Sequence, residues 1–532
     1  MKRSFILASL TSLLLFLIFP LFSLWPLAFV SLIPLYFGFE NLSTHRTFLV
    51  TWLSGFFFFC GLLHWIVFNP AVESWVRPLL YLGVMLIAAY LSLFLAASFT
   101  LAKWLTGKLN IPFWWAAPFG LVLFDFIRSH GILGFPWGSL GYSLARWTSA
   151  IQMASITGVY GVTFWIVLVN GLIYGLIKYF IANRPFRLTP RFFLRMALVL
   201  LVFALPPLTG KLMLFPVNKK IRNSPLLNVS LIQGNIQQGF RWDREFREYN
   251  WQIYDSLSRQ AVKQPVDLLV WPETALPFYL RYEPEYYLRA LSLANDLKSS
   301  ILTGVPDFSY EPNRQTQLYY NSAFLIRPIY GLTGSYAKRH LVPFGERFPY
   351  KEKIPFIRNI NFGEGEWTPG ADSIIFDMGG INFSCMICFE SIFPEIARQQ
   401  VGRGARFLVN ITNDGWFGRS GAARQHAEMA VFRAVEQRRA IARCANSGIS
   451  MFILPTGEII KPTPLYKQMI ITNAIPLLNN RTFYQKYGDL FVLLILIVSI
   501  FPLMALLVKS LPFNLPKSFL PRKHRVFGRV NS

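Results

Sequence analysis

The sequence predicts a bundle of membrane-spanning helices joined to an α/β layered domain, and three observations support this fold class. Of the 532 residues, 53% are hydrophobic and only 15% are charged, which is too apolar for an ordinary soluble enzyme. Long apolar runs are concentrated before residue 210, and one more follows residue 488. Between them, short β-branched runs alternate with helical patterns, as in domains that layer helices on sheets.

Most of the apolar runs approach or exceed the roughly 20 residues needed to cross a bilayer, so we interpret them as membrane spans. Residues 5–39 are too long for one span, which predicts a helical hairpin turning at Trp25 and Pro26. No small-x-small cleavage site follows the first run before Trp25, so we expect it to be retained rather than removed as a signal peptide. The runs are 5–24, 26–39, 49–68, 79–105, 111–127, 156–176, 192–208 and 490–507.

The placement of lysine and arginine explains the formal net charge of +25. A basic excess is also typical of nucleic-acid-binding proteins, so position along the chain decides. Basic residues gather in alternate loops and in both tails, whereas the other short loops hold only Arg77, Arg128 and Arg146. The positive-inside rule then predicts that both termini are cytoplasmic and that the block between Lys211 and Asp489 lies on the far side. We therefore expect no nucleic-acid partner.

These patterns divide the chain into five predicted parts. Residues 1–210 form an N-terminal membrane domain of about seven helices, and residues 211–226 form a linker. Residues 227–478 form the extracytoplasmic α/β domain. Residues 488–509 form a C-terminal transmembrane helix, and residues 510–532 form a basic cytoplasmic tail.

Within the α/β domain, strands and helices are expected in turn. The strand-like segments are "NVSLIQGN", "VDLLVWPET", "SILTGVP", "GINFSCMICFE" and "ARFLVNITND". The helical segments are "REYNWQIYDSLSRQAVK", "EYYLRALSLANDLKSS", "ESIFPEIARQQVGRG" and "QHAEMAVFRAVEQRRAIARCA". The last of these predicts that Cys444 lies in a helix.

Polar residues end three of the predicted strands, which is where α/β domains commonly place their chemistry. Glu273 ends "LLVWPE", Cys388 ends "SCMIC" and Asn413 lies at the end of "FLVNITND". Between the first two lies "GSYAKRHLVPFGERFPY", with Lys338 in a strand-like run and Glu346 in the turn after it. A thiol, an amine and a carboxylate on neighbouring strand ends would suit acyl transfer through a covalent thioester.

Each residue type has a chemical reason to be there. Deprotonated cysteine is a strong nucleophile, a nearby glutamate can take its proton, and a lysine ammonium can hold the oxyanion of a tetrahedral intermediate. Taken singly, each has a structural alternative. Glu273 could be a first-turn helix carboxylate, Lys338 a solvated strand lysine, and Cys388 an inert buried thiol.

Cys388 is the predicted nucleophile of the pair Cys385 and Cys388. A turn into "ESIFPEIARQ" would expose its thiol beside a helix N-terminus, which favours a thiolate. Strand alternation turns Cys385 to the opposite face, where it would fill the core. A redox pair would favour a helix start holding both thiols, and a zinc site would need a second cysteine pair or matched histidines. We therefore expect no metal, no cofactor and no disulfide framework.

The ordered motifs "WPE", "YAKRHLVPFGE", "CMICFE" and "NDGWFG", after seven apolar spans, resemble the bacterial apolipoprotein N-acyltransferases. These are integral membrane members of the carbon-nitrogen hydrolase (nitrilase) superfamily, and the resemblance covers essentially the whole chain. It implies a nitrilase-like αββα sandwich on a bundle of eight membrane helices. It also implies a ping-pong reaction that moves an acyl chain from a membrane phospholipid, through a cysteine thioester, to the α-amino group of an apolipoprotein's N-terminal diacylglyceryl-cysteine.

The resemblance implies roles for the residues that match its motifs. Glu273 matches the general base, Lys338 the oxyanion-stabilising lysine and Cys388 the nucleophile of a Glu-Lys-Cys triad. Glu346, in "PFGE", matches an accessory active-site glutamate. Glu390 matches the acidic residue two places after the nucleophile.

Aromatic residues are expected to form a lid over the pocket. By resemblance, Trp242 in "FRWD" and Trp416 and Phe417 in "GWFG" lie on mobile loops. The stretch "VPFGERFPYKEKIPFIRNI" adds Phe344 and further apolar residues, so we expect a lid that admits acyl chains and keeps water from the thioester. One departure is Phe389, because tyrosine is common after the nucleophile in this family; a polar role for that side chain is in doubt.

Two predictions concern polar residues outside this site. Asp125 and Arg128 are one helical turn apart, which favours a mutual ion pair, with head-group anchoring as the alternative. His426, in "RQHAEM", is expected to fix the loop that carries Trp416 rather than to act as a base.

Two alternative functions remain open. One is a membrane-anchored amidase or nitrilase-type hydrolase that uses water as the acceptor. The other is a non-enzymatic scaffold, in which Glu273, Lys338 and Cys388 would lie more than roughly 10 Å apart. The membrane bundle favours the transferase, because a lipid acyl donor requires a pocket that opens at the bilayer surface. We therefore expect a multi-pass inner-membrane protein with a periplasmic catalytic domain.

Overall fold

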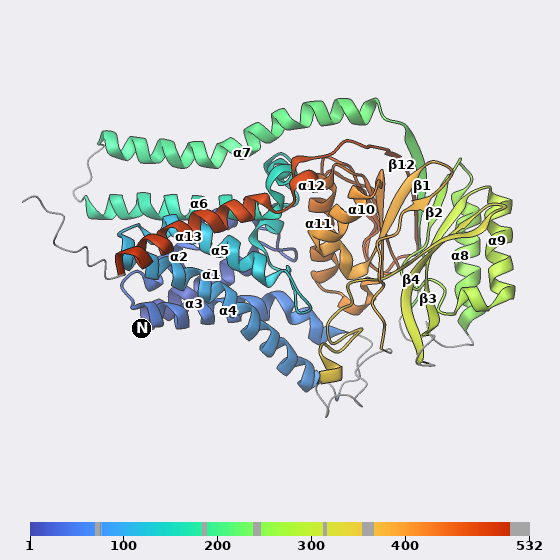
Figure 1. Cartoon of the computed structure of the whole chain (residues 1–532), viewed down its shortest axis with the longest axis horizontal. Helices are drawn as coiled ribbons and strands as arrows, with labels where there is room; N and C mark the ends of the chain where they lie inside the picture. The colour runs from blue at the N-terminus through green and yellow to red at the C-terminus, as the bar shows by residue number, and fades with distance from the viewer. Residues whose placement is uncertain are drawn as a thin grey trace, which may run out of the picture.

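A bundle of long helices and an α/β sandwich make up the protein and lie end to end (Figure 1). The computed structural model describes residues 1–69, 75, 77–183, 189–237, 246–311, 316–353 and 366–510. The bundle comes first in the chain, and α13 returns to it after the sandwich is complete. This is the predicted fold class.

Helices of the bundle follow the apolar runs of the sequence. Within the described residues, four helical stretches are long and apolar enough to cross a membrane: Thr44–Phe68, Arg77–Leu109, Ala150–Ala182 and Pro190–Arg222. Two shorter apolar stretches, Trp25–Phe39 and Leu490–Phe501, accompany them. The elements are α1 (Lys2–Leu17), η1 (Trp25–Phe29), α2 (Ile33–Phe39), α3 (Thr44–Leu63), η2 (His64–Phe68), α4 (Arg77–Leu109), α5 (Phe113–Arg128), η4 (Leu140–Leu144), η5 (Ala150–Met153), α6 (Ala154–Ala182), α7 (Pro190–Arg222) and α13 (Leu490–Ser510).

Buried polar side chains in the bundle bind backbone groups where the helices are interrupted. Arg128 pairs with Asp125, as predicted, and also donates to the carbonyl oxygens of Phe135 (2.5 Å) and Trp137 (2.8 Å) after α5 ends. The Asn170 side chain on α6 accepts from the backbone N–H of Leu32 at 2.9 Å, beside the start of α2. Such contacts are needed because a membrane interior offers no water to exposed backbone groups.

Two six-stranded sheets form the sandwich. One has the order β12-β1-β2-β3-β4-β5 and the other β11-β10-β9-β8-β7-β6. The centres of both sheets are parallel and read as continuous apolar runs, because both of their faces are covered. The strands are β1 (Leu226–Gln233), β2 (Leu268–Val270), β3 (Ser300–Glu311), β4 (Thr316–Arg327), β5 (Gly331–Ala337), β6 (Phe376–Asp377), β7 (Asn382–Ile387), β8 (Phe407–Thr412), β9 (Ile441–Ala445), β10 (Met451–Ile453), β11 (Ile459–Ile460) and β12 (Met469–Pro476).

Helices cover both outer faces, which completes the αββα order. The first pair, α8 (Arg247–Ala261) and α9 (Pro284–Leu297), lies on the face away from the bundle (Figure 1). The second pair, α10 (Pro394–Gly402) and α11 (Ala422–Gln437), lies between the second sheet and the membrane helices. Nearly every residue of α11 is buried, because this helix is covered on both sides.

The structure corrects two sequence predictions of element type and extent. Cys444 lies in strand β9 and not in a helix, because Arg438 takes a left-handed conformation (φ 51°) and ends α11. The next residues pair in parallel with β8. Helix α7 continues to Arg222 through Pro216, so most of the expected linker at 211–226 is helical.

Candidate active site

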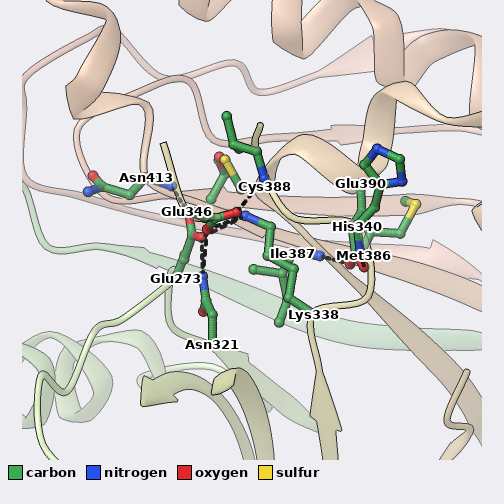
Figure 2. Close-up of polar contacts among 12 residues, drawn as sticks. Glu273, Asn321, Lys338, His340, Glu346, Met386, Ile387, Cys388, Glu390 and Asn413 are labelled. Carbon is green, nitrogen blue, oxygen red and sulfur yellow. Dashed lines mark hydrogen bonds and ion pairs between the residues drawn. The ribbon is translucent and has the colours of Figure 1, made fainter. Parts of the chain in front are cut away.

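Three strand ends from both sheets converge on one buried point (Figure 2). Glu273 follows β2 through Trp271 and Pro272, Lys338 directly follows β5, and Cys388 directly follows β7. Lys338 Nζ lies 3.5 Å from Glu273 Oε1, and Figure 2 shows Cys388 beside both side chains. The wide separation expected of a non-enzymatic scaffold is not observed.

Backbone and amide donors hold the Glu273 carboxylate in place. Asn321 Nδ2 donates to its Oε1 at 2.8 Å, and the backbone N–H of Asn413 donates to its Oε2 at 2.9 Å. Gly304 on β3 makes room for this segment, because a Cβ there would lie 2.6 Å from Glu273 Cα. These two hydrogen bonds fix the orientation of the Glu273 carboxylate before any substrate binds.

Asn321 is a site residue that the sequence predictions missed. It lies inside β4, and its amide also reaches Glu346 Oε1 at 3.3 Å, so it bridges two carboxylates. An available signal was its position in "YYNSAF", because asparagine is depleted inside strands.

Lys338 is held between two carboxylates and is only 1% exposed. Its Nζ lies 2.7 Å from Glu346 Oε1, and Glu346 Oε2 accepts from the backbone N–H of Val342 at 2.8 Å. Burial disfavours the ammonium, but the charges of Glu346 and Glu273 outweigh it and raise the pKa of Lys338 above its ordinary value. The lysine is therefore a fixed positive charge beside Cys388.

Cys388 adopts a backbone conformation that L-residues rarely take, with φ 51°. Such a conformation costs of order 1 kcal/mol or more and turns the chain sharply out of β7 into the short turn η10 (Cys388–Ile392). Burial and the charge of Glu273 raise the pKa of the Cys388 thiol, and Lys338 opposes them only in part. The predicted exposure of the thiol beside a helix N-terminus is wrong, because Cys388 is buried and begins a five-residue turn rather than a long helix.

Glu390 connects the turn of the nucleophile to the segment after β5. Its Oε1 accepts from the Tyr336 hydroxyl and from the backbone N–H of Arg339, both at 2.7 Å, and from that of His340 at 3.2 Å. Its Oε2 accepts from the backbone N–H of Ile387 at 2.7 Å. Burial raises the pKa of this carboxyl. These hydrogen bonds hold the backbone on both sides of the site, at Ile387 and at Arg339 and His340, so the place of Glu390 in the structure is that of a positioning residue.

His426 links the same turn to the loop η11 (Asp414–Phe417). Its Nδ1 lies 3.1 Å from Asp414 Oδ1, and its Nε2 lies 3.1 Å from the carbonyl oxygen of Cys388. Arg443 Nη2 binds the other oxygen of Asp414 at 2.9 Å. These contacts agree with the predicted part of His426 in fixing this loop.

The predicted lid residues lie in different surroundings. Phe344 is 49% exposed, and Trp416 is partly buried. Phe417 is only 8% exposed and packs against Trp65 of the membrane bundle, with ring centroids 4.7 Å apart. Trp242 lies outside the described residues.

Phe389 fills an aromatic cluster between the sandwich and the bundle. Its ring centroid lies 6.0 Å from that of Phe135, 6.0 Å from that of His340 and 5.1 Å from that of Phe393. Burial, and then the charges of Lys338 and Arg339, lower the pKa of His340 to about 4. The position after the nucleophile thus has an apolar packing partner on the membrane side.

Cys385 is fully buried, as predicted for a core residue. All four cysteines of the chain are free. Among the described residues, no group of three or more His, Cys, Asp or Glu side chains is placed to hold a metal ion.

Comparisons with known proteins match both parts of the chain. The family profile "Apolipoprotein N-acyltransferase N-terminal domain" matches residues 11–172, and the profile "Carbon-nitrogen hydrolase" matches residues 228–482. An apolipoprotein N-acyltransferase of Geobacter metallireducens is 37% identical over 497 residues, covering 92% of each chain. One of Chlorobaculum tepidum is 30% identical over 523 residues, covering 92% of this chain and 94% of its own. Among solved structures, an amidase from Nesterenkonia sp. is 17% identical, covers 50% of this chain and 94% of its own, and gives a TM-score of 0.38.

Proposed function

The chain belongs to the apolipoprotein N-acyltransferase family. We propose that Cys388, Glu273 and Lys338 together catalyse the transfer of an acyl chain from a membrane phospholipid to an apolipoprotein. The acceptor is the α-amino group of the N-terminal diacylglyceryl-cysteine. The observation that supports these roles best is the convergence of a buried thiol, a carboxylate and an ammonium at three strand ends.

In the first half-reaction, Glu273 takes the thiol proton as Cys388 Sγ attacks the carbonyl carbon of a phospholipid ester. Burial and the charge of Glu273 raise the pKa of the thiol, which favours a mechanism in which a base takes the proton during the attack. The Lys338 ammonium holds the oxyanion of the tetrahedral intermediate. The ester C–O bond then breaks, Glu273 returns its proton to the leaving oxygen, and a lysophospholipid departs from the thioester.

In the second half-reaction, the neutral α-amine of the acceptor attacks the thioester carbonyl. The C–N bond forms, the C–S bond breaks, and Glu273 transfers a proton from the nitrogen to the sulfur. Glu346 and Asn321 keep Lys338 and Glu273 aligned through both steps, and Glu390 holds the strained turn of Cys388.

The arrangement of the termini supports a periplasmic sandwich. The N-terminus and the end of α13 lie at the same end of the bundle, opposite the sandwich (Figure 1). With the basic tails cytoplasmic, the sandwich lies on the outer face of the inner membrane, where the lipid donor and the lipoprotein acceptor meet.

Phe344, Trp416 and Phe417 form an apolar wall around the acyl chain. Phe417 packs against Trp65 of the bundle and is buried, whereas Phe344 is exposed. We therefore expect the loop that carries Phe344 to be the part of the lid that moves. Replacing Phe344 and Trp416 by alanine should slow acyl loading; unchanged loading and transfer would refute the lid.

Intact mass spectrometry after incubation with phospholipid tests the proposal. The wild type and a Cys385→Ala control should gain an acyl-sized adduct that hydroxylamine removes, and Cys388→Ala should not. A diacylglyceryl-cysteine peptide with a free α-amine should then discharge the adduct onto its nitrogen, whereas an N-acetylated peptide should not. Discharge at the same rate by water alone would identify a hydrolase instead.

A further inference from the structure

A cavity of about 240 Å³ lies between the sandwich and helix α7. Its walls are the C-terminal half of α7, the start of α6 and the segment that leads from β12 into α12 (Phe483–Tyr487). Figure 1 shows α7 and α12 on the upper side of the molecule, and Glu273, Lys338 and Cys388 are not among the residues that line this cavity. The cavity is therefore separate from the acyl-transfer site.

Helix α7 contributes one continuous face to this cavity. Met213, Pro216, Val217 and Lys220 line it, and their spacing of three and four residues places them on the same side of a helix. Met213, Pro216 and Val217 make most of this face apolar, and Lys220 adds a positive charge at its end nearest the sandwich. The opposite side of the helix is lipid-like in character, with Leu212 and Phe215 largely exposed.

The polar wall of the cavity is positively charged. Lys220, Arg438 and Arg481 line it, and no acidic residue does. Arg438 is 4% exposed and donates only to neutral oxygens: Gln152 Oε1 at 2.6 Å, the carbonyl of Pro455 at 2.9 Å and Ser155 Oγ at 3.3 Å. A buried guanidinium without a carboxylate is costly unless an anion neutralises it.

Neighbouring cations add to the positive charge of this wall. Arg439 lies next to Arg438, and its pKa is lowered to about 10 by burial and by the charges of Arg406 and Arg481.

The depth of the cavity matches that of lipid head groups. Ser155 and Ile156, in its wall, begin the membrane helix α6, and Phe483 precedes the membrane helix α13 by less than two helical turns. The cavity thus lies at the level where the membrane helices start on the sandwich side. A soluble anion would not need the apolar face of α7, but a lipid would.

We propose that this cavity binds the head group of an anionic phospholipid, with its phosphate between Lys220, Arg481 and Arg438 and its acyl chains along the apolar face of α7. The lipid is not the acyl donor. It fills the cavity between α7 and the segment before α12, and it thereby stabilises the contact between the C-terminal end of α7 and the sandwich.

Thermal unfolding of the full-length protein in neutral detergent, with native mass spectrometry of retained lipid, tests the proposal. The probes are dioleoylphosphatidylglycerol, dioleoylphosphatidylcholine and inorganic phosphate. Phosphatidylglycerol should raise the Tm and remain bound, and the double variant Lys220→Gln/Arg481→Gln should weaken its binding about tenfold or more, because each cation near a charged lipid contributes separately. Lys211→Gln, exposed on the same helix but outside the cavity, is the matched control and should bind as the wild type does.

Three results would overturn the proposal. Equal binding of phosphatidylglycerol by the double variant would place the lipid elsewhere. Equal retention of phosphatidylcholine would show that the cations do not recognise the head-group charge, and equal stabilisation by inorganic phosphate would assign the cavity to a small anion. Both substituted side chains are exposed, so the lipid-free Tm of the double variant should match the wild type and confirm that it folds.

Discussion

At the scale of single residues, the candidate site places the buried Cys388 thiol beside the Glu273 carboxylate and the Lys338 ammonium. Burial and the Glu273 carboxylate raise the pKa of the Cys388 thiol, which agrees with the proposed removal of its proton by Glu273 during the attack. Lys338 stays charged because two carboxylates contact it. The charge needed in the transition state is thus present before the substrate arrives.

The pH dependence of thiol alkylation should report this arrangement. Because the pKa of Cys388 is raised, labelling by iodoacetamide should still be increasing above pH 9, where a free cysteine with its ordinary pKa approaches a plateau. In Glu273→Gln the neighbouring negative charge is lost, so the midpoint should move to lower pH. Labelling rates measured by intact mass at several pH values check both points; a plateau below pH 8 in the wild type would contradict them.

Asn321→Leu should slow acyl loading without unfolding the protein. The leucine keeps the approximate volume but removes the donor to Glu273 and Glu346, so the base and the lysine lose alignment. Loss of one such hydrogen bond, about 1 to 1.5 kcal/mol, corresponds to roughly a tenfold slower single-turnover loading rate. Asn473→Leu on the edge strand β12 is the control, and equal rates in both variants would remove Asn321 from the site.

Glu273 and Cys388 could be selected from the sequence because each ends a strand-like run, and Lys338 because it lies in one. Their predicted roles came from the resemblance of the surrounding motifs to the family. Asn321 was missed: its place within a strand-like run was unusual for asparagine, but it lies in the middle of β4 and reaches the site only through the antiparallel register with β5. A register between strands is a property of the folded sheet and leaves no mark at a strand end.

At the scale of elements, Gly210 sets how closely α7 approaches η5. A Cβ at this position would overlap the carbonyl oxygen of Ser149. Gly210→Ala should therefore lower stability by about 1 to 3 kcal/mol through overpacking, in spite of the better helix propensity of alanine.

Gly107→Ala in α4 is the matched control, because nothing lies within 4 Å of its added Cβ. It should leave the Tm unchanged or raise it slightly, since alanine favours a helix. Tm values of both variants in the same detergent measure the difference. A Gly210→Ala variant as stable as the wild type would show that α7 can move away from η5 without cost.

Helices of the bundle were predictable because the length of an apolar run depends on the bilayer and not on neighbouring elements. The end of α11 was not, because the helical pattern runs on through "RRAIARCA" and the stop lies in the backbone of Arg438. The extent of α7 was also missed. Its last turns are too polar to count as a span, yet they remain helical.

At the scale of the whole molecule, α11 attaches the sandwich to the bundle. Gln425 on this helix accepts from Trp137 Nε1 at 2.7 Å and donates to the carbonyl of Pro20 at 3.0 Å, so it binds two separate membrane segments. Arg146 adds an ion pair with Glu428 at 2.6 Å.

Gln425→Leu should loosen this attachment. It leaves a buried indole N–H and a buried carbonyl without partners, which costs about 1 to 3 kcal/mol each. We expect a lower Tm and faster proteolytic cleavage between the two parts, whereas Arg424→Leu, exposed on the same helix, should change neither. Unaltered proteolysis of Gln425→Leu would show that other contacts suffice.

The length of α7 has a consequence for the membrane in which the protein works. Its 33 residues span about 50 Å, close to the full thickness of a bilayer with its head groups, and only Asn223, Ser224 and Pro225 separate it from β1. In a thinner bilayer a helix of fixed length tilts, and here the first strand of the sandwich must follow. If Cys388 takes its acyl chain from a membrane lipid as proposed, its height above the lipid ester groups should then depend on bilayer thickness. Acyl loading from a trace ester lipid should vary across vesicles of non-cleavable ether lipids of different chain length, and a constant rate would show that the joint before β1 absorbs the tilt.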